Sequence, residues 1–168
     1  MPPVVFIMLG GVRPDAIITA NCPTINSLRE RGASTMTARS VMPSITLPCH
    51  TSIFHSVPPT RHGITSNTFI PMARPLPGLV EVAHAAEKRV AFFYNWEELR
   101  DLARPGNIHY SHFRDSAYQR DGDDETVAEA ISFIQKDRPD FVFIYIGTVD
   151  TVGHDHGWMS EEYLRQLE

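Results

Sequence analysis

The chain has 168 residues, of which 42% are hydrophobic and 21% are charged, and its formal net charge is −5. This is the composition of a globular domain, because disordered chains are poorer in apolar residues and carry more net charge. We therefore expect a single folded domain over residues 1–168. The negative net charge and the lack of a basic run argue against a nucleic-acid-binding surface.

The cysteine content and the N-terminal residues bear on the compartment. Cys22 and Cys49 form neither a disulfide framework nor a metal-ligand pair. The apolar run at residues 4–9 is too short for a signal peptide or a membrane span. These features predict a cytoplasmic protein that does not enter the membrane.

Apolar runs and helical periodicities alternate along the chain. Continuous apolar runs predict buried parallel strands at residues 4–9, 89–94 and 140–147, and weak alternation suggests another strand at 33–39. Helical spacing predicts helices at 23–32, 79–86, 123–134 and 160–168. This order predicts an α/β fold with a mostly parallel sheet sandwiched by helices.

The first stretch with possible chemistry surrounds Thr46. Pro43 and Pro48 disfavour helical geometry in the residue before each, so Met42 and Leu47 are expected to be extended. Thr46 would then lie on a tight connection just before a helix. Free N–H groups at a helix start favour an anion, which suits a hydroxyl nucleophile attacking phosphate or sulfate. The alternative is that Thr46 only caps the helix.

The second such stretch follows the strand predicted at 140–147. Asp150 and His154 are four residues apart, just past the strand end. A carboxylate and a neutral imidazole suit a divalent cation, zinc in particular, and ligands bind at the carboxyl ends of parallel strands. The alternative is a polar loop with solvated charges.

Both stretches resemble one known family. The segment P-S-I-T-L-P-C-H-T-S-I-F, followed by P-P-T-R-H-G-I-T-S-N, and the later D-x-x-G-H are similar to motifs of the type I phosphodiesterase / nucleotide pyrophosphatase branch of the alkaline phosphatase superfamily. The resemblance implies an alkaline phosphatase-like fold and a small-molecule phosphate-ester substrate. It also implies Thr46 as nucleophile and metal contact, and Asp150 and His154 as joint ligands of one divalent metal ion, zinc by ligand type.

The sequence departs from the pattern of that family at two positions. Gly10 stands where the first strand of relatives ends in a metal-binding Asp, and Asp15 lies five residues further on. Cys49 stands where relatives usually carry an Asn that contacts phosphoryl oxygens, and a thiol cannot donate as an amide does. His156 has H-x-H spacing to His154 but matches no ligand position. We therefore expect at most one incomplete metal site.

Other polar features have ordinary interpretations beside the functional ones. His62 precedes a glycine, which is more typical of a turn or packing residue than of a metal ligand. Residues 107–122 could form a surface loop or an insertion that faces the substrate. Three prolines at residues 67–78 predict an irregular loop.

The resemblance covers the N-terminal part of a family catalytic domain. It implies that relatives continue to an Asp-His-Gly segment and a further His, so we expect a fold that is incomplete at its C-terminus. An unpaired sheet edge would favour self-association. The predicted function is metal-dependent hydrolysis of phosphate esters through a phosphothreonine at Thr46, with weak or no turnover. The alternatives are an inactive relative acting as a binding or partner module, and a related phosphatase, phosphonate hydrolase or sulfatase.

Overall fold

The fold is built on one parallel sheet, seen in a computed structural model that describes residues 2–72 and 74–168. The strands within these residues are β1 (Val4–Leu9), β2 (Val90–Tyr94), β3 (Tyr110–Phe113) and β4 (Phe141–Ile146). They lie in the order β1-β4-β2-β3, and every neighbouring pair is parallel. The predicted α/β fold with a parallel sheet is confirmed.

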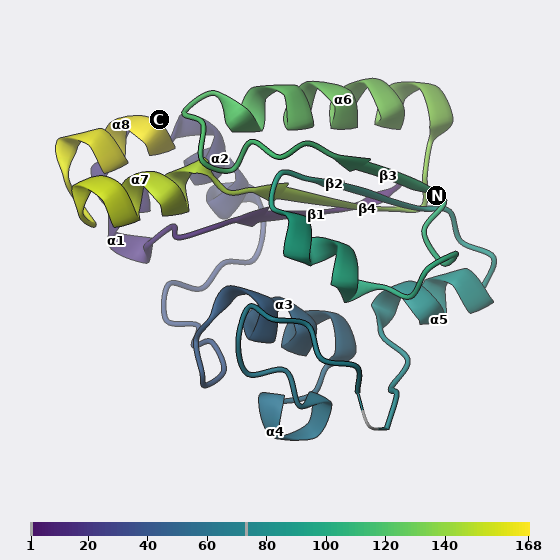
Figure 1. Ribbon diagram of the computed structural model, residues 1–168. Helices are drawn as coiled ribbons and strands as arrows, with labels where there is room; N and C mark the ends of the chain where they lie inside the picture. The colour runs from purple at the N-terminus through teal and green to yellow at the C-terminus, as the bar shows by residue number, and fades with distance from the viewer. Residues whose placement is uncertain (1, 73) are drawn as a thin grey trace.

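Helices cover both faces of this sheet and extend beyond one end of it (Figure 1). They are α1 (Pro14–Thr19), α2 (Pro23–Arg31), α3 (Thr46–His55), α4 (Pro59–His62), α5 (Leu79–Ala85), the 3-10 helix η1 (Glu97–Leu102), α6 (Gly122–Asp137), α7 (Thr148–His156) and α8 (Glu161–Leu167). Helix α6 packs on β2, β3 and β4, and α3, α5 and η1 lie across the opposite face. Helices α1, α7 and α8 pack together past the carboxyl ends of the strands. None of the described helices is long and apolar enough to cross a membrane.

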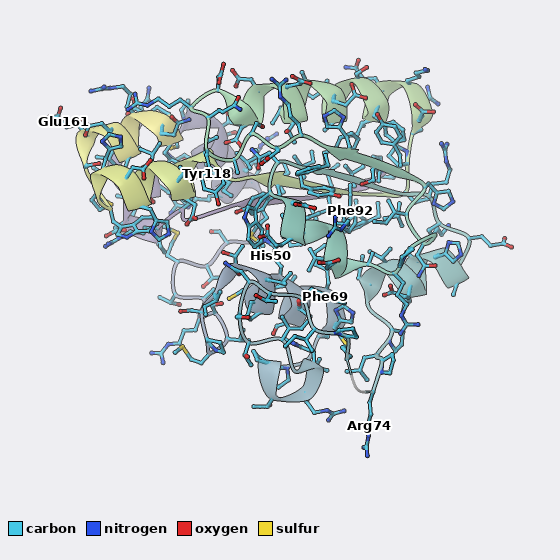
Figure 2. The ribbon with its side chains drawn as sticks, viewed as in Figure 1. His50, Phe69, Arg74, Phe92, Tyr118 and Glu161 are labelled. Carbon is cyan, nitrogen blue, oxygen red and sulfur yellow. The ribbon has the colours of Figure 1, made fainter. Side chains whose placement is uncertain are left out.

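The core follows from the alternation of side chains along β2 and β4. Phe92 and Phe143 face α3, where their rings pack edge-on against each other and against the Phe54 ring. The centroid distances of these three pairs are 5.0–5.6 Å. The intervening residues, Phe93 and Ile144, face α6. Full burial of each such side chain contributes roughly 1.5–3 kcal/mol to folding. Figure 2 shows Phe92 pointing from the sheet into the α3 layer.

Strand β1 differs from its expected burial on both faces. Val5 is 41% and Ile7 is 52% exposed, whereas Phe6 and Met8, on the other face of the strand, pack on the α3 side of the core. The expectation was wrong because β1 is an edge strand, and α6 packs on the other strands of the sheet. Strand β3, at the opposite edge, was missed because its four residues are mixed polar and aromatic.

Local geometry also departs from the predictions at several places. Residues 33–39 form no strand. Leu47 is helical because α3 begins at Thr46, so Pro48 lies within the first turn, where its missing N–H costs nothing. The irregular loop at 67–78 is confirmed in its described residues; Ala73 lies outside them.

His62 is a packing residue, as its sequence context indicated. Its Nδ1 accepts a hydrogen bond from the Ile64 N–H at 3.0 Å. The proton of the neutral ring therefore lies on Nε2, which donates to Ser52 Oγ at 3.0 Å. Both bonds are buried, and the bond to Ser52 holds α4 against α3.

Two buried histidines predict that acid weakens the fold. Burial lowers the pKa of His50 and of His62 below the ordinary value of 6.5. Their stabilising contribution is complete above 6.5 and is lost as the pH falls from 6.5 through the folded pKa values. Burial raises the pKa of Asp150 above its ordinary 3.8, which acts in the opposite direction. Urea unfolding at pH 7.5, 6.5 and 5.5 should show decreasing stability.

The matched variants are His62→Gln and, as control, His156→Gln, since His156 is exposed. His62→Gln should make the free energy of unfolding depend less on pH, and His156→Gln should leave this dependence unchanged. Stability that rises between pH 6.5 and 5.5 would contradict this account.

Candidate active site

A pocket of about 270 Å³ lies at the carboxyl edge of the sheet. Its walls come from the start of α3, the segments that follow β2, β3 and β4, and helix α7. The lining residues include Thr46, Asn67, Trp96, Tyr118, Tyr145, Asp150, Thr151, His154 and Asp155. The structure therefore brings Thr46, Asp150 and His154 to one pocket, although they are far apart in sequence.

Thr46 is held by the contacts of the first turn of α3. The Leu47 N–H donates to Asn67 Oδ1 at 3.0 Å, which satisfies one of the free donors of the helix start. His50 Nδ1 donates to the Thr46 carbonyl at 2.8 Å, and its ring packs edge-on against Tyr145 at 5.4 Å. Figure 2 shows His50 between α3 and the sheet. The backbone that carries the Thr46 hydroxyl is thus fixed from two sides.

Asp150 and His154 lie on helix α7 rather than on a loop. Residues four apart share a helix face, and Asp150 Oδ2 is 3.7 Å from His154 Nε2. Two atoms each about 2.1 Å from a tetrahedral zinc ion would be roughly 3.4 Å apart, so the pair fits one edge of such a site. Burial raises the pKa of Asp150, and His154 acts in the opposite direction. A bound cation would also favour the ionised carboxylate.

The same residues do not complete a metal centre. Within residues 2–72 and 74–168, no group of three or more His, Cys, Asp or Glu side chains could hold an ion. Gly10 offers no ligand, and a Cβ there would lie 2.7 Å from Tyr145 Oη. Asp15 pairs with Arg13 at 2.6 Å and does not line the pocket. Of the residues named here, Asp150 and His154 could therefore supply part of the shell of one cation.

Cys49 and Asn67 differ in how they relate to the pocket. Cys49 Sγ hydrogen-bonds with Ser40 Oγ at 2.9 Å and is not among the lining residues. Asn67 does line the pocket, and because its Oδ1 accepts from Leu47, its amide N–H groups are left for other partners. Sequence reasoning missed Asn67, although it ends the H-G-I-T-S-N segment that carries the family resemblance.

Asp123 is a second residue that sequence reasoning did not assign to this site. It lies in the first turn of α6, and its carboxylate accepts from the backbone N–H groups of Gly147 at 3.0 Å and Thr148 at 3.2 Å. It also accepts from the Thr148 hydroxyl and, at 2.6 Å, from Asn95 Nδ2. Asp123 thus caps α7, the helix that carries Asp150 and His154, and ties it to the end of β2.

Two glycines allow α7 to reach its place. Gly11 has φ of +68°, and a Cβ there would lie 2.6 Å from the Asp150 Cα. A Cβ on Gly153 would overlap the Trp158 ring, which packs edge-on against the His154 ring at 5.2 Å. His156, by contrast, is exposed and does not line the pocket. The glycine in D-x-x-G-H thus lets an aromatic ring support His154.

Comparison with known proteins gives the family. Residues 4–168 match the type I phosphodiesterase / nucleotide pyrophosphatase family. The chain belongs to this family. It is 29% identical over 180 residues to an uncharacterised pyrophosphatase/phosphodiesterase of Schizosaccharomyces pombe. The match covers 95% of the chain and 36% of this relative. It is 22% identical to ectonucleotide pyrophosphatase/phosphodiesterase family member 3 of Mus musculus, over 100% of the chain and 21% of that protein.

Solved structures support the same fold. An inactive threonine-to-alanine variant of murine ectonucleotide pyrophosphatase/phosphodiesterase 5, in complex with AMP, matches with a TM-score of 0.76 at 18% identity, covering 99% of this chain and 49% of that one. Phosphonoacetate hydrolase from Sinorhizobium meliloti, in complex with phosphonoformate, matches with a TM-score of 0.73 at 23% identity, covering 99% and 51%. The chain thus spans about half of these structures and roughly a fifth to a third of the curated relatives.

The close approach of Gly11 to Asp150 predicts a large effect of one added methyl group. Gly11→Ala should destabilise the fold by about 2–4 kcal/mol, because it adds backbone overlap to the cost of a left-handed residue. Gly106→Ala is the matched control, since Gly106 also has positive φ (+87°) but has open space around it. It should cost about 1 kcal/mol. Equal losses in urea unfolding would show that contact with Asp150 is unimportant.

The Asp123 cap predicts a second effect on α7. Asp123→Asn should cost about 1–3 kcal/mol, because one carboxylate oxygen becomes a donor that faces other donors. Asp124→Asn, at the exposed neighbouring position, should change stability by less than about 0.5 kcal/mol. Hydrogen exchange should also speed up at the Gly147 and Thr148 amides in the first variant alone. Unchanged protection there would refute the cap.

Proposed function

We propose that this chain carries the nucleophile and one cation-binding pair of a metal-dependent phosphate-ester hydrolase, acting on phosphodiesters or nucleotide pyrophosphates. The observation that carries the proposal is the meeting of Thr46, Asp150 and His154 at one pocket on the carboxyl edge of the sheet. Parallel sheets bind their ligands at this edge. Membership of the type I phosphodiesterase / nucleotide pyrophosphatase family supports the reaction class.

Thr46 is the proposed nucleophile. Its Oγ would bond to phosphorus while the ester P–O bond breaks, with the hydroxyl proton passing to solvent, and water would then hydrolyse the phosphothreonine. The murine relative supports this role, because its structure with AMP was obtained with an inactive variant that lacks a threonine. The first turn of α3, held by Asn67 and His50, would keep the hydroxyl in position.

The charges of the pocket support metal dependence. None of its lining residues is Lys or Arg, whereas Asp150 and Asp155 both lie in its wall. An anionic phosphate would be repelled by these carboxylates unless a cation intervened. Asp150 and His154 would hold that cation, zinc by ligand type, which would polarise the phosphoryl oxygens. Asn67 would donate from its amide to a phosphoryl oxygen beside Thr46.

The proposal is tested by hydrolysis of bis(4-nitrophenyl) phosphate in the presence of Zn²⁺. Slow release of 4-nitrophenolate is expected, since the described ligands fill only part of one metal shell. Thr46→Ala should reduce the rate of 4-nitrophenolate release to the rate measured without protein. The loss should be at least about 100-fold if the unaltered chain is that much faster than this background. Thr60→Ala, at an exposed position of α4, is the control and should leave the rate unchanged. Removal of metal with EDTA should have the same effect as Thr46→Ala.

The other outcomes separate the alternatives. Faster cleavage of 4-nitrophenyl phosphate or 4-nitrophenyl sulfate than of the diester would identify a phosphatase or a sulfatase. AMP binding without any Thr46-dependent turnover would indicate an inactive relative that acts as a binding module. Full activity of Thr46→Ala would refute the nucleophile.

Two further expectations stay predictions. The cytoplasmic location is consistent with the two free cysteines, Cys22 and Cys49. Self-association is consistent with the exposed Val4 and Ile7 of edge strand β1.

A further inference from the structure

We propose that the Tyr145 hydroxyl takes the place of the side chain missing at position 10 and donates a hydrogen bond to an oxygen of the bound phosphate ester. The inference rests on the proposed function, because it concerns the ligand of the same pocket. It differs from that function in assigning the Gly10 side of the pocket to a neutral donor rather than to a second metal ion.

The space at position 10 is filled by this hydroxyl. Gly10 follows β1 and lies beside the end of β4, since its N–H donates to the Ile146 carbonyl at 2.8 Å. An added Cβ would meet Tyr145 Oη at 2.7 Å and the Asp150 Cβ at 3.4 Å. A side chain at position 10 and the Tyr145 hydroxyl therefore compete for one volume beside Asp150.

The Tyr145 ring is fixed in that volume from several sides. The residue is only 3% exposed, and His50 packs edge-on against the ring at 5.4 Å. On another side, a Cβ at Gly147 would lie 2.8 Å from the ring atom Cε1. The ring thus needs a glycine at both position 10 and position 147, and it has little room to turn.

The hydroxyl itself has no partner within the chain. Among the residues that the structure describes, Tyr145 Oη makes no hydrogen bond, although the side chain is nearly fully buried and lines the pocket. The oxygen is not among the buried polar atoms that lack a hydrogen-bond partner, so it opens on the pocket, where water or a ligand can accept its proton. Because it lines the same pocket as Thr46 and Asp150, the partner it can reach is a molecule in that pocket.

The protonation state of the phenol suits this role. Burial and the nearby Asp150 and Asp123 carboxylates raise the pKa of Tyr145 above its ordinary value, so the hydroxyl keeps its proton at neutral pH. It can therefore donate to an anionic oxygen without adding negative charge to a pocket that already holds Asp150 and Asp155. A carboxylate at position 10 would do the opposite and would require a further cation.

The test measures AMP binding by calorimetry in the presence of Zn²⁺. Tyr145→Phe, which keeps the ring, should weaken AMP binding about tenfold and leave Zn²⁺ affinity unchanged. Gly10→Ala should weaken AMP binding similarly, because the added methyl displaces the hydroxyl. The double variant should bind AMP no more weakly than either single variant, since each substitution removes the same hydrogen bond. A ¹³Cζ-tyrosine signal that shifts with AMP should be absent from Tyr145→Phe.

The control is Tyr110→Phe, which removes a hydroxyl that donates to Glu129 and does not line the pocket. It should bind AMP as the unaltered chain does. If the unaltered chain and Tyr145→Phe bind AMP equally, and Thr46→Ala weakens AMP binding in both, the role of Tyr145 is refuted. The proposed function is not contradicted by that result. No AMP binding by the unaltered chain would contradict both this inference and the proposed function.

Discussion

The pocket depends first on the Asp123 carboxylate. Its oxygens accept hydrogen bonds from two backbone N–H groups at the start of α7, from the Thr148 hydroxyl and from Asn95. An ionised acceptor at a helix N-terminus is favoured by the helix dipole as well as by the hydrogen bonds. Because Asn95 directly follows β2 and Gly147 directly follows β4, the same carboxylate joins two adjacent strands to the helix that carries Asp150 and His154.

The α3 side of the pocket is organised by side chains in a comparable way. Asn67, which follows α4 and is distant in sequence, accepts a hydrogen bond from the first turn of α3. His50, within α3, donates a hydrogen bond to the Thr46 carbonyl. The His50 ring also contacts Tyr145 of β4, so the helix and the sheet share one aromatic contact beside the pocket. The positions of Thr46 and Asp150 are therefore linked by packing through His50 and Tyr145, although the residues lie on different helices, α3 and α7.

The elements that the sequence predicted best are those with strong local signals. The apolar runs of β2 and β4 and the periodicity of α6 specify their structure because burial on defined faces decides it. The convergence of Thr46, Asp150 and His154 followed from motif resemblance together with the rule that ligands bind at strand carboxyl ends. The roles of Asp123 and Asn67 could not be predicted, because each depends on a partner brought near only by the fold. The exposure of β1 likewise depends on strand order, which the apolar run itself does not encode.

Gly10 changes the chemistry of the pocket by more than the loss of one ligand. A carboxylate there would bring a third negative charge beside Asp150 and Asp155, and such a cluster is stable only around cations. With glycine, that volume goes to a phenol whose raised pKa keeps it neutral. The negative charge that the site must balance is correspondingly smaller, so the single cation proposed at Asp150 and His154 would attract an anionic ester without a second ion. The same exchange would remove a Lewis acid from the proposed reaction, which would lower turnover more than it lowers affinity. A chain of this kind should therefore retain ligand binding better than catalysis.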